Sequence, residues 1–200
     1  DEIQINALPE EPPKSFQASL LSFWAASAIA MCEDHRKGDG APAIRSMMIQ
    51  TSARTQPHSL FAGWVRSIKD HWKRTLRNSD SSSYEALIDE FRSAFLELKE
   101  TYDTSKTFED IQIWLPEAID ETRVVEVNST EDAIKEIKWY ESQFWILVGG
   151  MKLDRGFTVQ GITHTYMPRA VSENGATLQQ RARFFGYHRR YFGLCRIYIA

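Results

Sequence analysis

The sequence feature that most constrains the fold is a run of five apolar residues, 144–148, that ends at the pair Gly149-Gly150. The run FWILV has the length and composition of a β-strand, and glycine is typical of the place where a strand ends. Because glycine has no side chain, the backbone that follows can approach a bound molecule closely. We therefore predict a strand here, followed by a loop that can bind a ligand.

Short apolar strands alternate with helical stretches along the rest of the chain. The other predicted strands are residues 44–51, 123–127 and 162–167, and the predicted helices are 16–33, 61–76, 84–98, 107–119 and 176–185. This alternation favours an α/β fold with a mostly parallel central sheet and right-handed crossovers. The apolar stripes of the helices between 57 and 100 have the spacing of core positions, so we assign them to packing rather than to a cofactor site.

The chain is predicted to hold one domain, residues 16–200, after a lead-in or linker at 1–15. A helical insertion at about 57–119 is expected on the rim of the sheet. Because the chain begins with Asp1, we expect it to be part of a longer protein. Its longest apolar stretch, residues 20–31, is shorter than the ~20 residues of a membrane-spanning helix. The two cysteines offer no disulfide framework, so we expect a cytoplasmic protein with no membrane partner.

Charge is distributed unevenly along the chain. Residues 78–142 hold 17 acidic and 6 basic side chains, whereas residues 143–200 hold 2 acidic and 8 basic ones. Such blocks are usually solvated surface, but the basic block contains the glycine loops. We therefore expect a polyanion to meet the last third of the chain.

The loops after the predicted strands carry groups suited to phosphate. Asp154, Arg155, Gly156 and Thr158 follow the glycine pair, and the predicted helix 176–185 carries Gln179, Arg181 and Arg183. Arginine supplies a planar fork of donors that matches phosphate oxygens. Gln179 and Arg183 are one helical turn apart and can face the same cleft. On the residues alone, these side chains can equally form caps and surface ion pairs.

Two motifs resemble the endonuclease Z1 domain family: VGG, three residues and DRGFT at 148–158, and QxxxR, FFGY and R at 179–189. That family occurs in bacterial helicase-like ATPases of restriction and defence systems. The resemblance implies a RecA-like, three-layer domain, the second of the two in superfamily-two helicases. It covers about residues 16–199, and the last sixty residues carry most of its specificity.

The resemblance also implies roles for particular residues. Residues 149–158 correspond to helicase motif V, so Gly149, Gly150, Asp154, Arg155, Gly156 and Thr158 are expected to face the nucleotide. Residues 179–189 correspond to motif VI, so Gln179, Arg183 and Arg189 are the expected catalytic residues, with Arg183 the first choice for an arginine finger. Ala182 replaces the usual glycine and His188 the usual arginine. This leaves open which of His188, Arg189 and Arg190 would be the second finger group.

The chain contains no GxxxxGK[ST] loop, which nucleotide hydrolysis requires. ATP and Mg²⁺ are therefore expected only in the full-length protein, with the metal held by an N-terminal P-loop RecA-like domain. This fragment alone is expected to be inactive. The other expected partners are double-stranded DNA and a nuclease subunit. Donors to DNA phosphates are expected at strand ends: Ser52, Arg54, Asn128, Ser129 and Thr130.

A nuclease activity of the chain itself is not favoured. The tripeptide Glu136-Ile137-Lys138 matches the E-x-K part of a metal-dependent nuclease pattern, but Glu97-Leu98-Lys99 matches it equally well inside a helix. No proline-aspartate element precedes either one, so no metal site is predicted. His164 lies in an alternating strand and is expected to be packed. The predicted function is the second RecA-like domain of a DNA-dependent ATPase, and the alternative is a non-catalytic domain that docks a nuclease subunit.

Overall fold

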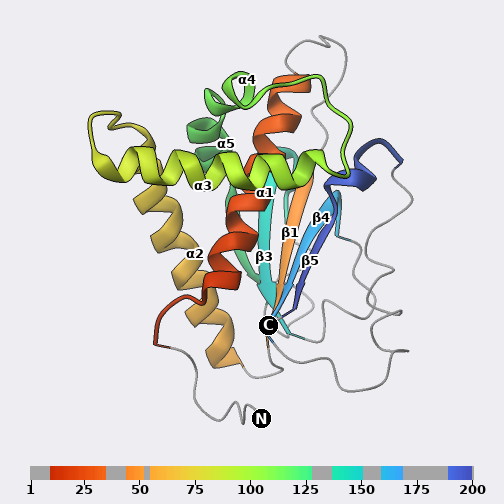
Figure 1. Cartoon of the computed structure of the whole chain (residues 1–200). Helices are drawn as coiled ribbons and strands as arrows, with labels where there is room; N and C mark the ends of the chain where they lie inside the picture. The colour runs from red at the N-terminus through yellow and green to blue at the C-terminus, as the bar shows by residue number, and fades with distance from the viewer. Residues whose placement is uncertain are drawn as a thin grey trace, which may run out of the picture.

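One sheet of five parallel strands organises the molecule, and helices cover one of its faces (Figure 1). This computed structural model describes residues 10–34, 44–51, 55–127, 137–150, 159–168 and 189–199. The strands are β1 (Arg45–Gln50), β2 (Arg123–Val127), β3 (Phe144–Gly149), β4 (Ile162–Met167) and β5 (Arg196–Ile199). Their order in the sheet is β2-β3-β1-β4-β5. The structure confirms the predicted α/β fold with a parallel central sheet, and the described residues are consistent with the three-layer type.

The three central strands are buried along their whole length. Every residue of β1, β3 and β4 is buried, whereas β2 and β5 at the two edges are partly exposed. Strand residues alternate between the two faces: Met47 and Ile49 join the main core on the helical side, while Met48 and Leu147 form a smaller cluster on the other face. Burial on both faces is the property of a parallel sheet, and it explains why these strands read as continuous apolar runs.

Helix α1 (Lys14–Asp34) lies at the centre of the helical layer. It contacts β4 on the sheet side and is crossed on its outer side by α3 (Ser82–Lys99) (Figure 1). Because neighbours surround it, its apolar residues face all directions and are almost all buried. By length and composition α1 would pass for a membrane span, but 72% of its most apolar window is buried inside the fold. Core packing therefore accounts for its apolar character.

The segment predicted as an insertion supplies the rest of this layer. Helix α2 (Thr55–Leu76) contacts β2 and β3, and α3 packs on α1 and α2. The predicted apolar stripes are core: Trp72 makes edge-to-face contacts with the rings of Trp24 and Phe91. The side chain of Ser81 caps α3 by accepting a hydrogen bond from the backbone N–H of Tyr84. These helices share one hydrophobic core with the sheet.

The prediction of a single helix over 107–119 is wrong. The structure contains two helices, α4 (Phe108–Gln112) and α5 (Leu115–Glu121). Pro116 lies in the first turn of α5, and a proline has no N–H to continue the hydrogen-bond ladder of a preceding helix. Thr107 and Asp110 form a capping box that starts α4.

The sequence did not predict the last two elements. A 3-10 helix, η3 (Arg189–Leu194), leads into the edge strand β5. A second short 3-10 helix, η1 (Trp139–Glu141), precedes β3. The predicted helix over 176–185 lies outside the described residues. The cysteines of the chain, Cys32 and Cys195, are free thiols.

Candidate functional site at the carboxyl edge of the sheet

Three neighbouring strands end at the same level on one edge of the sheet. Gly149, the last residue of β3, pairs with Gln50 of β1 on one side and with Val127 of β2 on the other. The backbone N–H of Thr51 donates to the carbonyl oxygen of Gly149 at 2.9 Å. The segments predicted to bind ligands begin directly after these residues, at positions 52, 128 and 150. The sheet therefore brings the starting points of all three segments to one edge.

Strand β1 is the point in the sheet at which the connections diverge, because later strands are added on both of its sides. From β1 the chain passes over β3 to reach β2 at one edge, and after β3 it passes over β1 to reach β4 on the other side. In open α/β sheets, ligands bind outside the carboxyl ends of strands where the connections diverge in this way. The described residues at that point are Gln50 and Thr51 at the end of β1 and the glycine pair at the end of β3.

Thr51 carries a buried hydroxyl without a hydrogen-bond partner. The residue is 7% exposed, and its Oγ1 atom has no partner within the structure. A buried hydroxyl without a hydrogen bond costs about 1–3 kcal/mol of stability, so the presence of one here needs an explanation. A bound oxyanion or backbone group would supply the missing partner. The predicted site includes Ser52 but not Thr51, although the position of Thr51 directly after a buried strand was the available signal.

Of the predicted site residues, the structure describes three. Gly149 and Gly150 are buried at the carboxyl edge, in the predicted place. Arg189 is the third, with its backbone described. The other predicted residues lie outside the described residues: Ser52, Arg54, Asn128, Ser129, Thr130, Asp154, Arg155, Gly156, Thr158, Gln179 and Arg183, together with the alternative His188.

Arg189 begins a helix at the opposite edge of the sheet. It is the first residue of η3, which ends directly before β5 begins, and β5 runs parallel to β3 and β1. The guanidinium of Arg45, at the start of β1, lies 4.2 Å from the ring centre of Tyr191 in η3. Figure 1 shows η3, in blue, near the top and the strand ends near the bottom. A six-residue strand is about 20 Å long, so Arg189 and Gly149 do not share a site.

Ion pairs engage the charged residues between α2 and the β2 edge. Glu126 of β2 accepts hydrogen bonds from Ser59 at 3.0 Å and Arg66 at 2.9 Å, both on α2. Asp120 pairs with Lys73 and Arg77, and the hydrogen bond from Lys73 lowers the pKa of this carboxyl. These carboxylates are satisfied by their neighbours. In the described parts of the chain, no group of three or more His, Cys, Asp or Glu could hold a metal ion.

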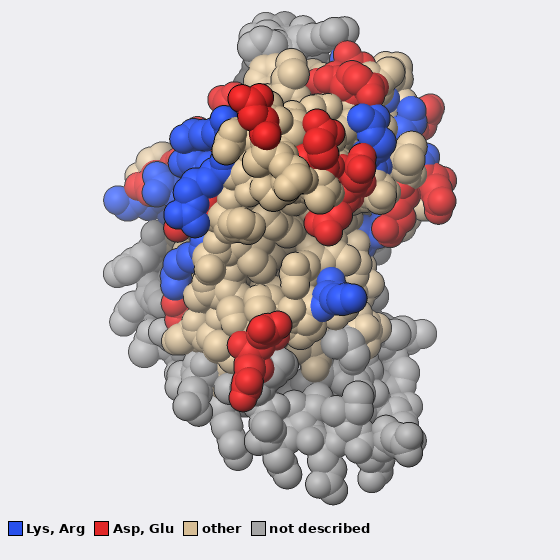
Figure 2. Space-filling model, turned by 60° about the vertical axis from the view of Figure 1, so that its left-hand side comes forward, with Lys and Arg blue, Asp and Glu red and all other residues tan. Residues whose placement is uncertain are grey.

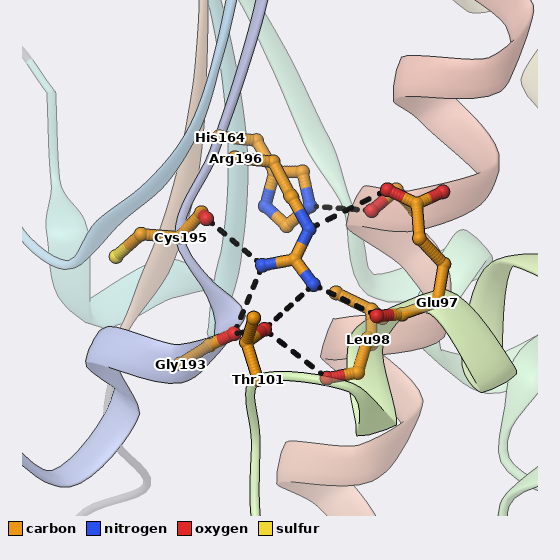
Figure 3. Close-up of polar contacts among 8 residues, drawn as sticks. Glu97, Leu98, Thr101, His164, Gly193, Cys195 and Arg196 are labelled. Atoms are coloured by element: carbon orange, nitrogen blue, oxygen red, sulfur yellow. Dashed lines mark hydrogen bonds and ion pairs between the residues drawn. The ribbon is translucent and has the colours of Figure 1, made fainter.

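His164 of β4 is packed in the core, as predicted. It is completely buried, and its ring nitrogens lie 3.0 Å from the hydroxyls of Ser22 and Thr163. Figure 3 shows the ring beside Arg196, with which His164 pairs across the sheet. Burial, reinforced by the nearby Arg196 charge, lowers its pKa to about 3. Burial likewise raises the pKa of the Cys195 thiol to about 11. A histidine that stays neutral and a thiol that stays protonated are structural groups. The candidate site is therefore the carboxyl edge of the sheet.

The model of one protein family, described as the Z1 domain, matches residues 15–200 of the chain. The match covers the sheet, the helical layer and all segments of the candidate site. No curated protein and no solved structure matches the chain.

Proposed function

The chain belongs to the Z1 domain family, and from this premise we propose that it is the second RecA-like domain of a DNA-dependent, helicase-like ATPase or translocase in a restriction or defence system. The observation that supports this most is the alignment of strand ends at the carboxyl edge. Gln50, Val127 and Gly149 lie side by side there, so the segment that resembles motif V starts next to the two segments assigned to DNA. The unmet hydroxyl of Thr51 at the same edge fits a polar ligand.

In this proposal the carboxyl edge faces an ATP site that is completed by an N-terminal P-loop domain, which also holds Mg²⁺. Gly149 and Gly150 let the backbone approach the nucleotide, together with Asp154, Arg155, Gly156 and Thr158. Arg183, oriented with Gln179, stabilises the negative charge that spreads over the transferred phosphoryl oxygens. The P-loop domain holds the nucleotide, and this chain supplies the cation that hydrolysis needs.

The segments after β1 and β2 are assigned to double-stranded DNA. Ser52, Arg54, Asn128, Ser129 and Thr130 would donate hydrogen bonds to backbone phosphates, which position the duplex without reading its sequence. Because both segments start within one strand width of the glycine pair, movement of bound DNA can be coupled to the nucleotide site.

The test is DNA-stimulated ATP hydrolysis by the full-length protein, wild type against Arg183→Ala, with nucleotide binding measured alongside. Loss of a finger should reduce turnover by about 10³-fold while binding survives. Arg74→Ala, which removes an exposed guanidinium from α2, is the matched control and should leave turnover unchanged. Unchanged turnover in Arg183→Ala would refute the proposal.

Arg189→Ala distinguishes the two candidate fingers. Because Arg189 begins η3 at the opposite edge, its replacement is expected to change turnover far less than that of Arg183. An equally large loss in both variants would contradict the assignment of Arg183 as the finger.

A second candidate function is docking of a nuclease subunit, and the surface of the outer helices favours it. The outer helices α3 and α4 carry exposed carboxylates, and two large apolar side chains on or next to these helices are also exposed, Leu96 at 58% and Ile113 at 73%. The carboxylates are Glu85, Asp89, Glu90, Glu97 and Glu109. Figure 2 shows a row of basic groups along the left of the view, and acidic groups interspersed with basic ones at the upper right. A basic partner surface with apolar anchors would complement this face.

This candidate is tested by co-purification of the full-length protein with its nuclease subunit. Leu96→Glu should abolish the complex if α3 is the docking surface, whereas Ser93→Ala on the same helix should not. The two functions are compatible, because the docking surface and the carboxyl edge use different residues.

A further inference from the structure

Basic side chains follow the side of the molecule where helix α2 lies against the edge strand β2. Four of them are spaced three or four residues apart along α2, so they lie on one side of the helix, and the fifth is the first residue of β2. Helix α2 is on the left of Figure 1, and basic groups form a row on that side of the molecule in Figure 2. We call these five residues the basic stripe: Arg66, Lys69, Lys73, Arg77 and Arg123.

Two carboxylates form ion pairs with the basic stripe. Glu126 of β2 pairs with Arg66 at 2.9 Å. Asp120 of α5 pairs with Lys73 and also with Arg77, the latter at 3.3 Å. The guanidinium groups of Arg66 and Arg77 remain accessible, because their side chains are 50% and 60% exposed. The ion pairs therefore hold the stripe in place without covering it.

The other two members of the basic stripe form no ion pair within the described residues. Lys69 donates to the carbonyl oxygens of Asp120 at 3.0 Å and Thr122 at 2.6 Å, which carry no net charge. Burial lowers the pKa of Lys69, and the neighbouring charge of Arg123 lowers it further, so these two cations lie close together. Even with the exposed carboxylate of Asp70 nearby, the cations outnumber the carboxylates that act on the stripe.

The basic stripe begins beside the two segments that the proposed function assigns to DNA. Helix α2 starts directly after residues 52–54, and strand β2 ends directly before residues 128–130. Arg66 pairs with Glu126, which is next to the last residue of β2, whereas Arg123 is the first residue of that strand. The stripe therefore extends from the carboxyl edge of the sheet along the side of the domain, toward the amino edge where the strands begin.

The composition of this surface suits a polyanion better than a protein partner. Among the described residues of α2 and β2, no large apolar side chain is exposed. Protein interfaces have aromatic or apolar residues at their centre, whereas nucleic-acid interfaces are polar and strongly positive. Three of the five members of the stripe are arginines, whose planar fork of donors matches phosphate oxygens.

We propose that the basic stripe binds the phosphate backbone of double-stranded DNA and extends the contact made by the segments after β1 and β2. The inference rests on the proposed function, which supplies the partner. From Arg66 to Arg77 the helix rises about 16 Å. Each strand of duplex DNA has one phosphate per ~3.4 Å of axis, so about five phosphates of one strand can face the stripe. These contacts position the duplex and do not read its sequence.

The test is binding of a fluorescently labelled duplex to the full-length protein, measured by anisotropy at several salt concentrations without nucleotide. Each phosphate contact adds about 0.9 to the slope of log K against log salt. The triple variant Arg66→Ala, Arg77→Ala, Arg123→Ala should therefore reduce the slope by about three. It should also weaken binding at least tenfold at ~0.1 M salt, equally for duplexes of different sequence. A wild-type slope in the triple variant would overturn the inference.

Arg92→Ala is the matched control for Arg66→Ala. Arg92 of α3 is 42% exposed and pairs with Glu109 at 2.8 Å, which resembles the exposure and the ion pair of Arg66. Both variants lose one charge and one ion pair, but only Arg66→Ala should reduce the slope, by about one. Equal reductions would show that DNA responds to net charge alone, which would contradict a defined binding surface.

Asp120→Asn is expected to have the opposite effect. This change removes the carboxylate that pairs with Lys73 and Arg77, so both cations become available to phosphate. Binding should tighten severalfold and the salt slope should become steeper. Surface ion pairs contribute little to stability, so the variants should remain folded, which thermal unfolding checks. Weaker binding by a folded Asp120→Asn variant would contradict the inference.

The binding and turnover assays distinguish the two proposals. If Arg183→Ala abolishes turnover and the triple variant binds DNA with the wild-type slope, the inference about the stripe fails and the proposed function stands. If Arg183→Ala leaves turnover unchanged and the triple variant loses the slope, the ATPase assignment fails and the stripe remains a DNA-binding surface.

Discussion

The two edges of the sheet satisfy their polar groups in different ways. At the amino edge, side chains bond to backbone carbonyls across the ends of the strands: Ser46 to Gln160 at 2.7 Å, Ser142 to Phe144 at 3.1 Å and Arg196 to Gly193 at 2.9 Å. At the carboxyl edge, the hydroxyl of Thr51 is buried without a partner. Side chains of the chain itself therefore satisfy these carbonyls at the amino edge, whereas at the carboxyl edge the buried hydroxyl of Thr51 is left unmet.

The glycines of the two edges differ in the same way. At the amino edge, Gly161 has a φ of 63°, and a Cβ atom there would overlap the carbonyl oxygen of Ile44. Gly193 is equally crowded by Thr101. These glycines allow close packing within the protein. The pair Gly149-Gly150 ends a strand at the carboxyl edge, where the proposed function needs close approach to a nucleotide.

The largest effect on stability is expected from Gly161→Ala at the amino edge. The new methyl group meets the Ile44 carbonyl, and the left-handed backbone is strained for any residue with a Cβ. Overpacking and strain together should lower the free energy of unfolding by about 3 kcal/mol. Chemical denaturation measures this change. A loss below about 1 kcal/mol would show that the amino edge is not closely packed.

The next effect concerns pH and the buried His164. Its pKa is about 3 in the folded protein, against about 6.5 in the unfolded chain, so the unfolded chain binds the extra proton first. Stability is therefore complete above pH 6.5 and is lost as the pH falls, with a limit of about 1.4 kcal/mol per pH unit. Between pH 7.5 and 5 the loss should be about 2 kcal/mol.

His164 pairs across strands with Arg196, at the start of β5, so its titration reports on how well the amino edge of the sheet is closed to water. Urea denaturation at pH 7.5 and 5 measures the loss, and His164→Gln is the control that should remove most of the pH dependence. This window lies above the range where carboxyls such as Asp120 and Glu109, whose pKa values are lowered, begin to titrate. Equal stability at both pH values would show that water reaches this end of the core.

Much of the fold could be predicted because local pattern and tertiary environment agree. The strands β2, β3 and β4 lie where the apolar runs placed them, and α1 begins and ends within two residues of its prediction. β5 was missed because RIYI is only four residues long and half exposed, so it has no distinct apolar pattern. The order of the strands depends on contacts between distant segments and cannot be inferred from periodicity.

The candidate site was only partly accessible from the sequence. The carboxyl edge was predictable, because glycines and polar residues follow buried strands there. The position of Arg189 was not, since its placement at the opposite edge depends on the unpredicted η3 and β5. The unmet hydroxyl of Thr51 and the hydrogen bond from Thr101 to the carbonyl oxygen of Gly193 are three-dimensional properties. Nothing in the local sequence of Thr101 indicates that it bonds to a residue ninety-two positions away.

The smallest effects come from a matched pair of hydroxyl deletions, one at each edge. Ser46→Ala removes a satisfied bond at the amino edge and should lower the free energy of unfolding by about 1 kcal/mol. Thr51→Val removes an unsatisfied hydroxyl at the carboxyl edge while keeping its shape. It should raise the free energy of unfolding by about 1 kcal/mol. The reason is that folding of the wild-type chain removes water from this hydroxyl and gives it no hydrogen bond in return, and the variant avoids that cost.

The two variants are expected to change the free energy of unfolding in opposite directions, which tests whether the two edges differ. The rate of ATP turnover is a second measurement. If the carboxyl edge is the ligand edge, Thr51→Val should reduce DNA-stimulated ATP hydrolysis in the full-length protein although it stabilises the fold. Ser46→Ala should leave hydrolysis unchanged at temperatures where it is folded. If Thr51→Val instead destabilised the fold as much as Ser46→Ala, its hydroxyl would have a partner within the protein. The two edges would then not differ. Removal of the Thr51 hydroxyl can stabilise the fold only if that hydroxyl has no partner within the chain and is satisfied by a bound molecule instead.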